Sequence, residues 1–95
     1  MIDIAEVTRV YNEFQAFITE LSATWPEESL RDGRENARHC ELTEALECLI
    51  AAGLENRESI TADEMARFEH LASEISMSDS PWMERLRQAQ AARRG

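Results

Sequence analysis

Apolar residues recur every three or four positions along most of the chain, which is the spacing of helices with one buried face. The longest such run has apolar positions at Ile4, Val7, Val10, Tyr11, Phe14, Phe17, Ile18 and Leu21. Asp3, followed three residues later by Glu6, resembles a capping box at its start. The Trp25-Pro26 pair marks its end, because a residue before proline disfavours the helical region. The sequence therefore predicts a helix over about residues 4–23.

Glycine divides the middle of the chain in this interpretation. We expect Gly33 to separate a short helical turn near residues 27–32 from a longer helix over 34–52. Gly53, followed by Leu54, is typical of a left-handed cap that closes the longer helix. The buried stripe of that helix consists of Leu42, Ala45, Leu46, Leu49 and Ile50.

Two more helices follow in the last third of the chain. Thr61 and Glu64 have the spacing of a capping box, which predicts a helix over about 62–76. The Ser80-Pro81 pair begins another over about 81–92, since proline is favoured in a first helical turn. No stretch alternates like a strand. The predicted fold is all-α, a single domain (residues 1–95) built as a small bundle of about four helices.

Composition narrows the classes of protein that fit. The chain has 95 residues and a formal net charge of −9, and its apolar fraction of 43% is too high for a disordered acidic tail. No apolar run approaches the roughly 20 residues of a membrane span, and the first residues lack the basic-then-apolar order of a secretory signal. We therefore expect a cytoplasmic protein with no membrane contact.

Catalytic and cofactor motifs do not occur in the sequence. Metal-ligand spacings and phosphate-binding glycine loops are missing, so we expect no enzyme, no metal and no cofactor. Cys40 and Cys48 fall in the predicted helix 34–52, about 12 Å apart along its axis. That separation is too long for a disulfide between them, so we expect two reduced cysteines.

Acidic residues gather on predicted helix surfaces and suggest a protein-binding role. Carboxylates on rigid helices approximate the negative surface of a nucleic-acid backbone, which a basic protein would recognise. The candidate partner-binding residues are Glu6, Glu13, Glu20, Glu41, Glu44 and Glu47. An alternative interpretation is that this acidic surface serves only solubility.

Arginines near Gly33 form a second candidate site. Guanidinium groups suit phosphate or carboxylate, so Arg31, Arg34 and Arg38, with Trp25 nearby, could bind a small acidic ligand. The alternative is that these arginines pair with glutamates of the same segment, and that Trp25 lies in the core.

Residues 71–86 offer a third possibility. Leu71-Ala72-Ser73-Glu74-Ile75-Ser76-Met77-Ser78, followed by Ser80-Pro81-Trp82, resembles a helix-turn-helix DNA-binding unit over about 16 residues. Ser76 stands where that unit usually has a glycine. Residues 81–95 carry a net charge of +3, and the resemblance implies Arg85 and Arg87 as DNA contacts.

The sequence favours a non-enzymatic interaction protein. Its most specific form is a small acidic inhibitor that blocks a larger, basic, nucleic-acid-handling protein. In type and composition the chain is similar to anti-defence proteins of phages and mobile elements. The alternatives are the DNA-binding regulator and a self-assembling protein that binds a small acidic ligand. For self-assembly, we expect the uncharged flank Thr8, Asn12, Gln15 and Thr19 to pack against a second copy.

Overall fold

The computed structural model describes residues 3–94, with the backbone alone for Arg94. This part of the chain is all-helical, as predicted, and forms a small bundle of five helices rather than about four. The helices are α1 (Ile4–Leu21), α2 (Glu27–Arg38), α3 (Leu42–Glu55), α4 (Ala62–Glu74) and α5 (Pro81–Arg94).

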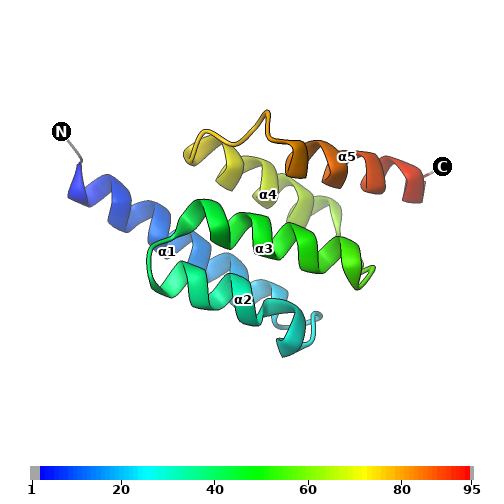
Figure 1. The fold of residues 1–95 in the computed structure, drawn as a ribbon, viewed down its shortest axis with the longest axis horizontal. Coiled ribbons are helices and arrows are strands. Elements are labelled where there is room, and N and C mark those ends of the chain that lie inside the picture. The colour runs from blue at the N-terminus through cyan, green and yellow to red at the C-terminus, as the bar shows by residue number, and fades with distance from the viewer. Residues whose placement is uncertain (1–2, 95) are drawn as a thin grey trace.

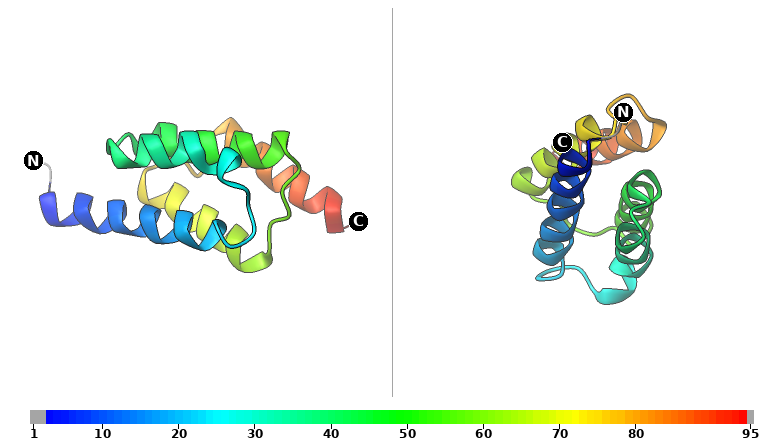
Figure 2. Two further views of the ribbon diagram at one scale, coloured as in Figure 1. Left: turned by 90° about the horizontal axis from the view of Figure 1, so that it is seen from below. Right: turned by 90° about the vertical axis from the view of Figure 1, so that its left-hand side faces the viewer.

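The helices pack into an elongated body with extents of 44 × 27 × 19 Å. α2 and α3 form an antiparallel hairpin, and α1 lies antiparallel to α2 (Figure 1). α4 packs beside α1, while α5 returns from α4 and packs on α3. The first turns of α1 project beyond the other helices at one end (Figures 1 and 2).

One hydrophobic core joins all five helices. Phe17 from α1 and Phe68 from α4 meet edge to face, with their ring centroids 4.9 Å apart. Trp25 follows α1 and is 3% exposed, so it belongs to the core. The indole Nε1 donates to the Ser59 carbonyl at 3.4 Å. The other fully buried large side chains are Phe14, Ile18, Leu21, Leu30, Leu46, Leu49, Ile50, Leu71, Met83 and Leu86.

Residues at the helix N-termini largely make the capping hydrogen bonds that the sequence predicts. Asp3 accepts hydrogen bonds from the first amides of α1, and Thr61 and Glu64 form a complete capping box on α4. Ser80 accepts from the Met83 amide at the start of α5. α1 ends at Leu21, two residues earlier than predicted, and turns lead from there to Trp25.

The prediction that Gly33 interrupts a helix is wrong, and so is the prediction that Gly53 caps one. α2 runs through Gly33, and α3 runs through Gly53 to Glu55. Both glycines are sites of close helix packing. A Cβ atom on Gly33 would lie 2.6 Å from Leu49 Cδ2, and one on Gly53 would lie 2.7 Å from Trp25 Cη2. These glycines let neighbouring elements approach closely.

The turns after α2, α3 and α4 use residues other than glycine. Cys40, Arg57 and Ser76 have φ angles of 59°, 52° and 60°. After each one, the next amide donates back to a carbonyl five residues earlier, as in the Schellman motif. Cys40 thus lies in the turn between α2 and α3, while Cys48 lies on α3. The prediction of both on one helix is wrong, although both are free, as expected.

We expect Ser76→Gly to stabilise the protein by about 1 kcal/mol. A non-glycine residue in the left-handed region costs roughly 1–2 kcal/mol, and glycine removes that cost while adding some chain entropy to the unfolded state. Urea unfolding measures the effect. Ser78→Gly is the control, because Ser78 has no positive φ, and this variant should lose stability. A loss of stability in Ser76→Gly would contradict the strain assigned to this turn.

Candidate functional site

The acidic flank of α1 faces α4 and pairs with basic residues. Glu20 Oε1 lies 2.8 Å from Arg67 Nη1, and the Arg67 guanidinium covers the Phe17 ring. Glu6 pairs with Arg9 one turn along α1. Three of the sequence-predicted partner-binding residues, Glu6, Glu13 and Glu20, therefore contribute to the polar edge of the α1–α4 contact.

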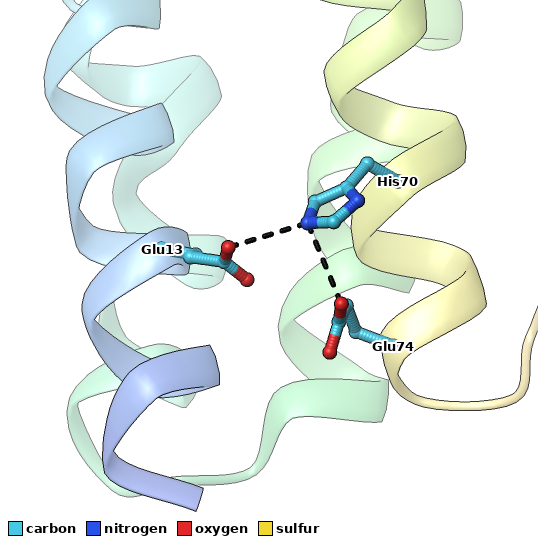
Figure 3. A group of neighbouring side chains, drawn as sticks. All are labelled: Glu13, His70 and Glu74. Carbon is cyan, nitrogen blue, oxygen red and sulfur yellow. Dashed lines mark hydrogen bonds and ion pairs between the residues drawn. The ribbon is translucent and has the colours of Figure 1, made fainter. Parts of the chain in front are cut away.

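Glu13, His70 and Glu74 form a cluster within this edge (Figure 3). His70 Nε2 lies 3.2 Å from Glu13 Oε1 and 3.5 Å from Glu74 Oε1. The three side chains could offer one ligand atom each to a cation. Arg9 competes for this role, because its guanidinium contacts Glu13 Oε2 at 3.2 Å and Glu74 Oε2 at 2.6 Å. Its hydrogen bond lowers the pKa of Glu74. Ion pairs within the chain therefore account for the cluster.

A different set of carboxylates has no basic partner among the described residues. These side chains lie on α2, on α3 or just before α3. No described side chain forms an ion pair with them or donates a hydrogen bond to them. We call them the α2–α3 acidic face: Glu28, Asp32, Glu41, Glu44, Glu47 and Glu55.

A shallow hollow runs between α2 and α3 on this face. Its volume is about 190 Å³, and Glu28, Asp32 and Glu55 line it together with Cys48. Ser29 and Asn56 lie at one end and hydrogen-bond to each other at 3.0 Å. The hollow is thus a concave surface rimmed by uncompensated negative charge.

The pKa of the Cys48 thiol is affected by the charge of this face. Partial burial raises the pKa of its thiol, and the carboxylates of Asp32, Glu47 and Glu44 raise it further. Asn36 Nδ2 donates to the sulfur at 3.3 Å, which opposes the shift without reversing it. The thiol is therefore a neutral, poorly reactive group, and the negative potential around it comes from both helices.

The arginines of α2 are paired within their own helix. Arg34 makes two hydrogen bonds to Glu27, at 3.0 and 3.1 Å, and Arg38 contacts Glu35 at 2.6 Å. This bond from Arg38 is the chief cause of the lowered pKa of Glu35. Arg31 is exposed. Because Trp25 is in the core, the four residues do not converge on one ligand site.

The α4–α5 segment contains the arginines of the DNA-binding alternative. Ser76 adopts the left-handed conformation that the helix-turn-helix unit usually gives to glycine, but α5 begins only at Pro81. Arg87 makes two hydrogen bonds to Glu69, at 2.7 and 2.8 Å, and a third to the Ser78 carbonyl. Arg85 stacks on Trp82, 5.1 Å from the ring centroid. Arg87 therefore joins α4 to α5 through these hydrogen bonds.

The Arg87–Glu69 pair predicts acid sensitivity. The guanidinium holds the pKa of Glu69 below its ordinary value of 4.5. Because the folded-state pKa is lower than the unfolded one, the pair stabilises the fold above pH 4.5, and this contribution is lost as the pH falls through the folded-state pKa. Urea unfolding at a series of pH values should show that Glu69→Gln weakens this dependence. Equal profiles for the wild-type and Glu69→Gln proteins would contradict the assignment.

Part of the acidic face was missed by the sequence reasoning. Glu41, Glu44 and Glu47 were candidates, whereas Glu28, Asp32 and Glu55 were not. Glu28 and Asp32 are four residues apart within the predicted helical turn 27–32, and this spacing places them on one side of it. Glu28 was among the glutamates expected as partners of the neighbouring arginines, and Glu55 lay beyond the helix end predicted at Gly53.

Comparisons with protein-family models, with curated proteins and with solved structures gave no match to this chain. Within residues 3–94, every helix is too short or too polar to cross a membrane. The physical chemistry of the α2–α3 acidic face therefore carries the functional interpretation.

Proposed function

We propose that the chain is a small acidic interaction protein that binds a larger basic, nucleic-acid-handling protein and blocks its nucleic-acid site. The supporting observation is the α2–α3 acidic face, where six carboxylates have no basic partner among the described residues. Such a face attracts a basic surface at long range and pairs with its Lys and Arg side chains on contact.

The rigidity of the face supports this role. α2 and α3 pack closely through Gly33, which lies against Leu49. The carboxylates are therefore held on two adjoining helices, with the hollow between them. Because the helices already fix its backbone, such an array loses less backbone freedom on binding than a flexible acidic tail does.

The proposed mechanism is competition. A nucleic-acid-binding surface carries Lys and Arg side chains that neutralise phosphates. The acidic face would occupy these side chains and exclude the nucleic acid. Stoichiometric inhibitors of this type, as in phage or mobile-element anti-defence systems, need no catalytic residue of their own.

The test is affinity capture from the native host lysate at low and at moderate salt, followed by a competition assay. We expect a captured protein that elutes with salt, binds nucleic acid by itself, and releases it when the chain is added in equimolar amount. A captured protein that keeps its nucleic acid in the presence of the chain would contradict the proposal. Capture of DNA alone would favour the helix-turn-helix alternative.

A further inference from the structure

The N-terminal half of α1 carries apolar side chains that the described bundle leaves uncovered. Ile4 is 79% exposed and Val7 is 41% exposed, and they are the large hydrophobic residues with this exposure in the described chain. Both belong to the same helical stripe that is buried from Val10 onward. The stripe therefore continues past the end of the core.

A groove lies beside these residues. It has a volume of about 360 Å³ and is lined by Val7, Thr8, Tyr11 and Asn12 of α1, by Arg38 at the end of α2, and by Cys40 in the turn that follows. α2 runs antiparallel to α1 and ends at Arg38, while the first turns of α1 continue beyond the other helices (Figure 1). α5 ends at the opposite end of the molecule, and no described segment covers the groove.

We propose that this groove binds the same helix of a second copy, so that two chains form a symmetric dimer through the N-terminal halves of α1. Two copies of this face are complementary when their α1 helices run antiparallel. With the two-fold axis between Val7 and Thr8, Ile4 of one copy lies against Tyr11 of the other, and Val7 lies against Thr8. These positions follow the three- and four-residue spacing that helix pairs use.

Charge favours a second copy as the occupant. The pairing positions between Ile4 and Asn12 are uncharged, so the overall charge of −9 is not concentrated at the contact. The same register brings Asp3 of one copy opposite Asn12 of the other, and Asn12 lines the groove together with Arg38. The Arg38 side chain contacts Glu35 at 2.6 Å but is 66% exposed, so the remaining N–H groups of its guanidinium can pair with that carboxylate. The dimer face is separate from the α2–α3 acidic face, so the two proposals succeed or fail independently.

Sedimentation equilibrium over a wide range of concentrations tests the dimer. We expect wild-type chain to dimerise, and Val7→Glu to raise the dimer dissociation constant by more than about tenfold, because the interface would bury an unpaired carboxylate. Helical content and melting temperature should change little, since Val7 lies outside the core. Ala66→Glu adds the same charge at an exposed site on α4 and should leave dimerisation unchanged.

A cross-link tests the register. In a Cys40→Ser background, Thr8→Cys should form an intermolecular disulfide on mild oxidation, because the two Thr8 positions flank the axis. Ala66→Cys in the same background should not. A wild-type chain that stays monomeric at all concentrations, or a dimer that Val7→Glu leaves intact, would overturn the proposal.

Discussion

Neutralising three carboxylates around Cys48 should weaken binding of the chain to its basic partner by about 30- to 1,000-fold, which corresponds to roughly 2–4 kcal/mol. The variant is Asp32→Asn with Glu44→Gln and Glu47→Gln. These side chains lie on both helices of the α2–α3 acidic face, and all three raise the pKa of Cys48. Removing their charge leaves Lys and Arg side chains of the partner desolvated without a counter-charge. Titration calorimetry with the captured partner measures the loss.

A matched variant separates this site from net charge. Asp63→Asn, Asp79→Asn and Glu84→Gln change the total charge by the same amount on the α4–α5 side of the molecule. We expect this control to bind within about threefold of wild type, since distant charges are screened beyond roughly 10 Å at 0.1 M salt. Equal losses in the two variants would show that binding depends on overall charge, and would refute a site on α2 and α3.

Phe68→Ala should destabilise the fold by about 3–5 kcal/mol. Phe68 is fully buried and contacts the Phe17 ring edge to face, and the Trp25 ring lies 6.4 Å away. It therefore joins α4 to α1 and to the turn that follows α1. Because a domain of this size has only about 5–15 kcal/mol of stability, the variant should be close to unfolding at 37 °C. Urea unfolding followed by circular dichroism measures the change.

Phe68→Leu is the control for this substitution. Leucine keeps much of the buried volume and loses only the aromatic contacts, so it should cost less than half as much as alanine. Ala66→Ser, at an exposed position on the same helix, should change stability by no more than about 0.5 kcal/mol. A cost below about 1 kcal/mol for Phe68→Ala would contradict the central place of this ring in the core.

Helix positions could be predicted from sequence where apolar spacing and capping residues agreed. The stripe from Val10 to Leu21 and the capping box at Thr61 both reflect local chemistry, and both are confirmed. The two helix-internal glycines were misread because glycine serves two purposes. It permits a left-handed turn, and it permits close approach of another element. Only the positions of Leu49 and Trp25 in three dimensions decide between these roles.

The paired and unpaired carboxylates could not be distinguished from sequence. Glu20 pairs with Arg67, and Glu13 contacts His70, across 47 and 57 positions of the chain. Helical periodicity predicts which side chains share a face, but it does not predict which basic residue of another helix will meet them. The α1 flank and the acids of α3 therefore appeared equivalent in sequence, whereas the packing of α4 on α1 neutralises the first set and leaves the second free.

The salt dependence of partner binding tests the proposed acidic interface most directly. Affinity between the wild-type chain and the captured partner should be measured across salt concentrations that shorten the Debye length from roughly 14 to 6 Å. We expect affinity to fall steadily with salt, and the slope to be smaller for the Asp32, Glu44 and Glu47 triple variant. An affinity that does not depend on salt, with equal slopes for both proteins, would contradict binding through the α2–α3 acidic face.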